Sequence, residues 1–539
     1  MRPNQPAGAR AFITPSRLFM ILVCVLVSIA YLAHGWGHEL ASLEGDEFIY
    51  LLSAEHFSSW TPHSPVAAYV AGNSPSPPLF PLLLSLTGGA QNILAANIMV
   101  AMLMLSSSAM FFFWLRAEEV SEWRAFLLAT FFAVLPGTYM HALFVMSEGL
   151  YLILSMAGLL AVAKSENTRD DRWLSVAAIC VSAAALTRSA GWALIAAFAV
   201  YLLWRRDKRT WQLLAVAALP AIAWTVYKKL TGGSEGLAYS GLFLEWYTKN
   251  PIWKSTSPIS ILFYQVGTEA DRFWKGLSAD FTTISAGTSI FGVVGILFLF
   301  AAAYRSYLRK LDGFYVIFYT AMILIWPFSY AANAEKRFVL VIIPILMFQA
   351  WYLIRRLSRS LFRRLRFNPA EVIYFSAIAL LALPAMALVT ARYFERVPQD
   401  LEPYRRVGWW YNWYWKDSMV PKYRYMKYAR VLSEGLPKIA GYIPKDDCIY
   451  SVKPYTVSFY TRRVSKYPPK EALNDADFSK ALHDSGCRYF FFMNEISQSF
   501  SNKLYYPVQR MGDVVEPIAH LDYAEGKEKV VMGILGKLK

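Results

Sequence analysis

Long apolar blocks separated by short charged segments fill the chain up to about residue 391. Residues 18–33 (LFMILVCVLVSIAYLA) carry no charge, and neither does the block from Asn92 to Leu115. A helix needs roughly 20 apolar residues to cross the hydrocarbon core of a bilayer. Several further blocks reach or approach this length, so the pattern predicts a polytopic α-helical membrane protein.

We expect eleven membrane spans, because eleven apolar blocks have the length and composition of a transmembrane helix. The blocks lie near residues 18–36, 92–115, 126–143, 149–163, 173–187, 190–204, 211–229, 287–304, 314–331, 338–354 and 371–391. Residues 1–36 also have the basic-then-apolar order of a signal peptide, but no small-residue cleavage site follows near Ala33 to Gly37. We therefore expect an uncleaved first helix.

Basic residues gather in alternate connecting segments and account for most of the net charge of +16. If the N-terminus is cytoplasmic, all of these clusters lie in the cytoplasm, as the positive-inside rule predicts. A nucleic-acid-binding surface would form one contiguous patch instead, so the sequence argues against nucleic acid as a partner. The clusters are Arg2, Arg10 and Arg17; Arg116 and Arg124; Lys164, Arg169 and Arg172; Arg205, Arg206, Lys208 and Arg209; Arg305, Arg309 and Lys310; and Arg355, Arg356, Arg359, Arg363, Arg364 and Arg366.

The same orientation assigns the other connecting segments to the outer side of the membrane. These segments are residues 37–91, 144–148, 188–189, 230–286 and 332–337. No Lys or Arg occurs between Leu18 and Leu115, which leaves the first outer loop acidic. We expect a bacterial inner-membrane protein with a cytoplasmic N-terminus and a periplasmic C-terminus.

The tail, residues 392–539, differs from the membrane part, residues 1–391, in its pattern of apolar and charged residues. The runs CIYSV (448–452) and CRYFFFM (487–493) predict buried strands, and helix-like stretches cover roughly 424–441 and 475–485. Strands that alternate with helices indicate a small α/β domain, which the orientation places outside the membrane. If the two strands are parallel neighbours, Cys448 and Cys487 can meet, and an oxidising compartment permits a disulfide between them.

An aromatic and basic linker, residues 404–428 (YRRVGWWYNWYWKDSMVPKYRYMKY), joins the two parts. Trp, Tyr and Lys at this density are typical of a collar at headgroup depth. They are equally compatible with a stacking surface for a sugar or lipid, and the sequence leaves both interpretations open.

Asp46 and Glu47 stand at the start of LEGDEFIYLLSAEHF in the first outer loop. The apolar residues that follow have helical spacing, so we expect a surface helix that holds both carboxylates near headgroup depth. Partial desolvation there would raise the basicity of the pair. A solvated acidic loop is the alternative. Glu47 and Tyr50, which is one turn further on, are candidate substrate-binding residues. The prolines of NSPSPPLFPLLLSL (73–86) predict a second short helix.

Four further charged residues fall at predicted outer ends of spans. Glu148 begins the fourth span, where it is either a helix-dipole cap or a functional carboxylate. Arg188 ends the fifth span, and Lys336 and Arg337 precede the tenth. Cations on the outer side need an anion, and Arg binds phosphate bidentately. We therefore assign all four residues as candidate substrate-binding groups.

Common hydrolase and nucleotide-binding signatures are absent from the sequence. The seven histidines are scattered without an HExxH spacing, and neither a P-loop nor a Gly-x-Ser-x-Gly elbow occurs. The sequence thus argues against a zinc hydrolase, a nucleotide-dependent enzyme and a serine hydrolase.

In order and sidedness, these motifs resemble those of the GT-C glycosyltransferases. The likeness is to the polyprenyl-phosphate-sugar branch, which includes protein O-mannosyltransferase-like enzymes and the lipid A aminoarabinose transferase. It is carried by Asp46-Glu47, PPLFPLLL (77–84), Met-Ser-Glu (146–148), LTRSAG (186–191), KRFVL before IPIL (336–346) and YIPKDDCIYSVKPYTVSFYTRR (442–463).

This resemblance implies transfer of a sugar from a polyprenyl phosphate to an acceptor hydroxyl, with Asp46 as the base and with inversion at the anomeric carbon. A lipid phosphate is a good leaving group that needs charge stabilisation rather than a second carboxylic acid, so one base suffices. The acceptor is a surface glycan, lipid A or a protein. We expect no obligatory metal, although a divalent ion is compatible with the family.

One position departs from the family pattern, because Ser76 stands where several members have a Lys or His before the two prolines. This loss shifts the phosphate-binding role to Arg188, Lys336 and Arg337, and it leaves the sugar open. A transporter or lipid flippase for glycolipid precursors is the alternative function, and a noncatalytic assembly protein is a third.

Overall fold

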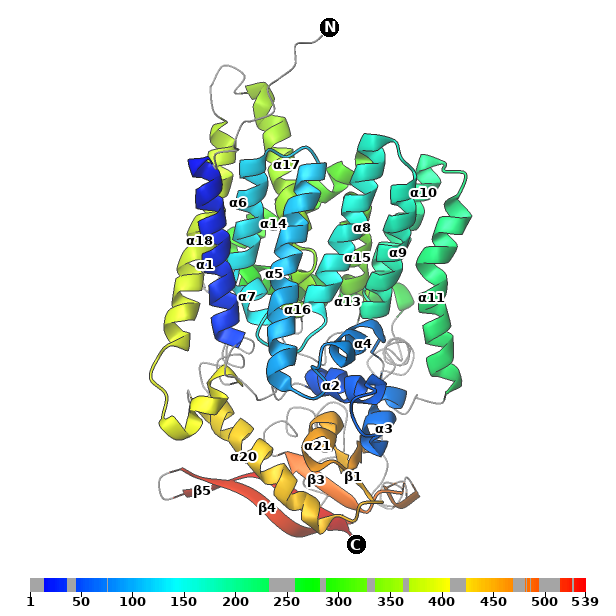
Figure 1. Cartoon of the computed structure of the whole chain (residues 1–539), viewed down its shortest axis with the longest axis vertical. Helices are drawn as coiled ribbons and strands as arrows, with labels where there is room; N and C mark the ends of the chain where they lie inside the picture. The colour runs from blue at the N-terminus through cyan, green and yellow to red at the C-terminus, as the bar shows by residue number, and fades with distance from the viewer. Residues whose placement is uncertain are drawn as a thin grey trace, which may run out of the picture.

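The computed structural model describes most of the chain. The described residues are 14–35, 45–74, 76–231, 257–281, 287–326, 335–361, 368–407, 423–468, 480, 482–484, 486–493, 514–525 and 528–539. In Figure 1 the helices form an upright bundle, and a smaller unit with a sheet lies beyond one end of it. This confirms the predicted class, a helical bundle followed by a small C-terminal α/β unit.

The bundle helices follow the predicted apolar blocks closely. They are α1 (Pro15–Gly35), α5 (Ile93–Ala117), α6 (Glu122–Val134), α7 (Pro136–His141), α8 (Glu148–Thr168), α9 (Arg172–Thr187), α10 (Gly191–Arg205), α11 (Thr210–Leu230), α14 (Gly287–Tyr307), α15 (Leu311–Ile325), α16 (Glu335–Leu340), α17 (Ile343–Leu361) and α18 (Pro369–Tyr393).

Five helices of the described chain are long and apolar enough to cross a bilayer, namely α1, α5, α8, α11 and α18. Three shorter apolar helices, α9, α10 and α15, lie among them. The total of eleven spans therefore stays a prediction.

Two of the predicted spans are each divided into two helices. The block 126–143 divides into α6 and α7 because Leu135 adopts an extended conformation before Pro136, which then begins α7. The block 338–354 divides at residues 341–342, where a turn separates α16 from α17. Both breaks create short helices whose residues reach the candidate site.

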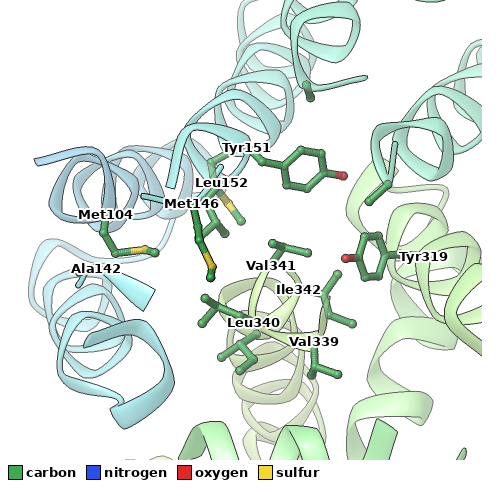
Figure 2. Packing of buried hydrophobic residues seen from close by; sticks show 14 of the residues in the cluster. Met104, Ala142, Met146, Tyr151, Leu152, Tyr319, Val339, Leu340, Val341 and Ile342 are labelled. Atoms are coloured by element: carbon green, nitrogen blue, oxygen red, sulfur yellow. The ribbon is translucent and has the colours of Figure 1, made fainter. Parts of the chain in front are cut away.

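The turn between α16 and α17 lies in a tightly packed apolar region. Figure 2 shows Met104 and Met146 on one side of residues 339–342 and Tyr151 and Tyr319 on the other. Residues 339–342, which are the last two residues of α16 and the two residues of the turn, are fully buried. Side chains from α5, α8 and α15 thus fix the start of α17 and the end of α16.

The segment between α1 and α5 contains three short helices beneath the bundle (Figure 1), namely α2 (Gly45–Phe57), α3 (Pro65–Asn73) and α4 (Leu79–Leu86). The sequence predicted α2 and α4 but not α3. In α3, Ser64 caps the N-terminus by accepting a hydrogen bond from the Ala67 amide, and Pro65 occupies the first turn.

The segment between α11 and α14 contains a helix that the sequence did not predict. Helix α13 (Pro258–Phe281) packs against α15, α16 and α7. Its charged residues, among them Glu269, Asp271 and Lys275, kept it out of a search for apolar spans, although its amphipathic pattern is that of a helix at a surface.

The C-terminal unit contains a five-stranded sheet with the order β2-β1-β3-β5-β4. Its strands are β1 (Cys448–Ser451), β2 (Val464–Lys466), β3 (Tyr489–Met493), β4 (Val515–Glu525) and β5 (Glu528–Leu538). Strand β1 is parallel to both β2 and β3, while β3, β5 and β4 are antiparallel neighbours.

Two helices accompany the sheet, α20 (Arg424–Ile439) and α21 (Pro454–Thr461). The predicted strands at 448–452 and 487–493 and the predicted helix at 424–441 are therefore present. Most of the stretch 475–485 and residues 408–422 of the aromatic linker lie outside the described residues.

The parallel pairing of β1 with β3 brings Cys448 and Cys487 together. Ile449 is paired with Tyr489, and the two cysteines form a disulfide that closes a separation of 39 residues. The interpretation that required parallel neighbours is therefore correct.

Candidate functional site

The first turn of α2 presents Asp46 at the end of the bundle that faces the C-terminal unit. Carboxylates are favoured in a first helical turn because the amide groups there are unpaired and the helix dipole is positive. The side chain of Asp46 is 42% exposed, and its Oδ2 accepts a hydrogen bond from Nη1 of Arg337 at 2.5 Å. Oδ1 has no hydrogen-bond or ion-pair partner within the described chain.

Glu148 lies at the centre of a cluster of charges. It is the first residue of α8, and its side chain is completely buried. Its Oε1 accepts a hydrogen bond from Nε of Arg337 at 2.5 Å and forms an ion pair with Nη1 of Arg188 at 2.6 Å. The arrangement is more than a helix cap, because one carboxylate holds two guanidinium groups from separate helices.

Arg188 follows the last residue of α9 and is buried with its partners. Its Nη1 also donates to the Ser147 hydroxyl at 3.2 Å, and the guanidinium lies 5.8 Å from the centre of the Phe338 ring. Burial opposes the charge of Arg188, but the Glu148 carboxylate outweighs this effect and raises the pKa of the guanidinium. Arg188 is therefore a permanent cation.

Tyr50 contacts this cluster through the hydroxyl of Ser147. Its hydroxyl shares a hydrogen bond of 3.0 Å with the Ser147 hydroxyl, and its ring packs edge-on against Phe80 of α4. Ser147 thus connects Tyr50 with Arg188. The sequence flagged Ser147 only as part of the Met-Ser-Glu motif and gave it no role.

Glu47 and Asp46 face different surroundings although they are adjacent. Glu47 is 1% exposed, and its Oε1 accepts a hydrogen bond from the amide of Val145 at 3.0 Å. The expected desolvation therefore applies to Glu47, whereas Asp46 is open at one side.

Lys336, the residue before Arg337, is buried, and its charge affects a carboxylate outside the ion cluster. Its charge stabilises the ionised form of Asp280, the penultimate residue of α13, which is fully buried. No hydrogen bond reaches either carboxylate oxygen of Asp280 from the described residues. The sequence did not identify Asp280, because only the packing of α13 brings it to this position.

The donor set of the cluster suits an anion better than a metal ion. The carboxylate oxygens Oδ2 of Asp46 and Oε1 of Glu148 are already held by guanidinium groups. Across the described parts of the chain, no three His, Cys, Asp or Glu side chains gather closely enough to bind a metal. Of the seven predicted site residues, Asp46, Glu148, Arg188, Arg337 and Tyr50 form one connected cluster, while Glu47 and Lys336 border it.

Comparison with known proteins gives structural likenesses only. No family model and no curated protein matches the sequence. ArnT from Cupriavidus metallidurans in the apo state aligns with a TM-score of 0.48 and 14% identity, over 96% of this chain and 97% of that chain. The apo oligosaccharyltransferase from Archaeoglobus fulgidus has a TM-score of 0.48 and 11% identity, over 95% and 74% of the two chains.

Arabinofuranosyltransferase AftD from Mycobacteria aligns with a TM-score of 0.44 and 13% identity, over 97% of this chain and 40% of that chain. The alignments thus cover nearly all of this chain at low identity. Because the TM-scores are below 0.5, we base no inference about chemistry on them.

Proposed function

We propose that this protein is a glycosyltransferase of the bacterial inner membrane, with its N-terminus in the cytoplasm and its C-terminal domain in the periplasm. It transfers a sugar from a polyprenyl-phosphate-linked donor to an acceptor hydroxyl at the outer face. The observation that carries the proposal is the position of Arg337, which contacts Asp46 and Glu148 at once. A base and a phosphate-binding cation thereby lie next to each other.

Asp46 is the proposed base. Oδ2 is held by Arg337, which fixes the orientation of the carboxylate, while Oδ1 has no partner in the described residues and can accept the proton of the acceptor hydroxyl. Proton removal by a positioned base contributes about 10²–10⁴-fold to a rate.

The leaving phosphate is the second charge to be stabilised. Arg337 and Arg188 present two guanidinium groups to the carboxylates of Glu148 and Asp46. One positive charge is in excess once Asp46 has taken up the acceptor proton. Lys336, the residue before Arg337, is a third candidate cation. Preorganised cations in a water-poor site stabilise charge that develops in the transition state. Glu148 has the role of a positioning residue, because both of its guanidinium partners depend on it.

The proposed reaction is a direct displacement. The acceptor oxygen forms a bond to the anomeric carbon as the bond from that carbon to the phosphate oxygen breaks. The acceptor proton passes to Asp46, and the polyprenyl phosphate leaves with the bonding electrons. A single displacement inverts the anomeric configuration. The acceptor is a surface glycan, lipid A or a protein, and membrane lipid surrounds the donor chain.

The test compares surface glycans of a deletion strain after complementation with the wild-type gene or with Asp46→Asn. Mass spectrometry should show one glycosylated species that the wild-type gene restores, and its mass would identify both sugar and acceptor. Asp46→Asn should lower its amount by at least about 100-fold at equal protein level, since the base is lost. Full restoration by Asp46→Asn would overturn the role of Asp46 as base.

A further inference from the structure

The helix that carries Asp46 is packed between the bundle and the C-terminal unit. In Figure 1, α2 lies directly between α4 and α21. Phe48 of α2 is completely buried, and its ring centre lies 4.9 Å from that of Phe459 and 5.5 Å from that of Tyr460, both in α21. The apolar face of α2 is thus covered by the C-terminal unit.

An ion pair fastens the other end of the same helix. Arg462, which follows α21, donates from Nη1 to Oε2 of Glu55 at 2.6 Å. Glu55 lies in the last turns of α2, and its side chain is 14% exposed. Contacts from α21 therefore reach both ends of α2, across more than 400 positions of sequence in the case of this pair.

The segment after α18 places a buried arginine within electrostatic range of Glu47. Arg406 is 1% exposed, donates from Nη2 to Oδ1 of Asn97 at 3.0 Å and lies 4.9 Å from the centre of the Phe144 ring. Burial lowers the pKa of Arg406 to about 10, and the negative charge of Glu47 opposes this shift. Glu47 is near enough to act on Tyr460 as well.

Glu47 thus connects three parts of the molecule. It accepts the amide of Val145 from the bundle, it is an electrostatic neighbour of Arg406, and it lies close to Tyr460 of α21. Since Asp46 is the adjacent residue in the same helical turn, whatever fixes Glu47 also fixes the backbone of Asp46.

We propose that the C-terminal unit is a positioning element of the proposed active site, which holds α2 through Phe459 and Arg462 so that Asp46 meets Arg337. The catalytic part of this statement rests on the proposed function, whereas the mechanical part does not. Phe459 and Arg462 are positioning residues, because they act through α2.

The mechanical part is tested by hydrogen exchange in the full-length protein in lipid nanodiscs. Phe459→Ala should raise the exchange rate of amides in residues 46–57 by about fivefold or more, since an aromatic contact is lost. Phe492→Ala is the matched control. Phe492 is a half-buried aromatic residue of β3 in the same C-terminal unit, and its ring stacks on that of Phe490 with 4.3 Å between the ring centres. This substitution should leave the exchange rates of the α2 amides unchanged.

A charge exchange tests the ion pair. Arg462→Glu alone and Glu55→Arg alone should each raise exchange in α2 by about threefold, and the double variant should return to the wild-type rate because the pair is rebuilt. A general loss of stability would not be repaired in this way. Unchanged exchange in Phe459→Ala together with no repair in the double variant would overturn the inference.

Glycan transfer in the complemented deletion strain tests the catalytic part. Phe459→Ala should lower transfer and Phe492→Ala should not. If Asp46→Asn proved fully active while α2 still loosened in Phe459→Ala, the proposed base would be wrong and the mechanical inference would stand. If Asp46→Asn were inactive and Phe459→Ala changed neither exchange nor transfer, the positioning role would be wrong instead.

Discussion

Single residues of the site differ in how far neighbouring sequence could reveal them. Arg188 and Arg337 stand out because each lies at a predicted end of an apolar span, and Asp46 stands out because an apolar helical pattern follows it. Asp280 does not, since it ends an amphipathic helix that already carries several charges. Asp280 is noteworthy because its carboxylate is completely buried and accepts no hydrogen bond from the described residues.

Asp280 gives a prediction with a definite pH dependence. Burial raises its pKa well above the ordinary value, and the charge of Lys336 opposes the shift. A carboxyl group whose pKa is higher in the folded than in the unfolded state binds its proton more tightly when folded. The free energy of unfolding therefore falls as the pH rises above about 4.

Asp280→Asn removes this titration and should make the protein more stable than wild type at pH 8, with a smaller difference at pH 5. Thermal unfolding midpoints of both proteins in detergent at the two pH values provide the measurement. A variant that is less stable than wild type at pH 8, or a difference independent of pH, would contradict the assignment.

At the scale of elements, the short helix α16 positions the cations. It carries Lys336 and Arg337, and it is held by a contact from α15, in which the hydroxyl of Tyr319 donates to the carbonyl oxygen of Phe338 at 2.8 Å. Figure 2 shows Tyr319 beside the turn that follows α16. This hydrogen bond joins a side chain of α15 to the backbone next to Arg337.

Tyr319→Phe should raise the KM for the lipid-linked donor about tenfold and change kcat less, because leaving a buried carbonyl without its partner costs roughly 1–2 kcal/mol and displaces α16. Tyr315→Phe is the control, since the hydroxyl of Tyr315 bonds to Tyr151 rather than to α16. Steady-state transfer with purified proteins gives the measurement. Equal effects of the two substitutions would argue against a special role for Tyr319.

At the scale of the whole molecule, the disulfide stabilises the unit that covers α2. Cys448 begins β1, and the same segment continues directly into α21. Because the bond closes a separation of 39 residues, its loss should cost the C-terminal unit about 2–4 kcal/mol of unfolding free energy.

Replacing Cys448 and Cys487 together by Ser should therefore make the C-terminal unit cleavable at lower protease or denaturant concentration, while fragments of the bundle remain intact. Limited proteolysis of both proteins across a urea series measures this. The oxidised wild type should also migrate differently with and without reductant after thiol blocking. Equal mobility would show that the bond does not form in the cell.

The sequence by itself determined the positions of most bundle helices, the expected sidedness of their ends and the helix that follows the acidic pair. These features depend on composition and short-range periodicity, which a local stretch contains in full. The breaks at Leu135 and between α16 and α17 were less visible, because a proline or a turn inside an apolar block changes hydropathy little.

Only the tertiary structure decided which charges meet. Asp46 and Arg337 are 291 positions apart, Arg337 and Glu148 are 189 apart, and Arg406 and Asn97 are 309 apart. No local pattern encodes such pairs, because they depend on how α2, α8, α16 and the C-terminal unit pack. The acidic pair was recognisable from the sequence. That Asp46 is partly exposed while Glu47 is buried follows only from the packing around α2.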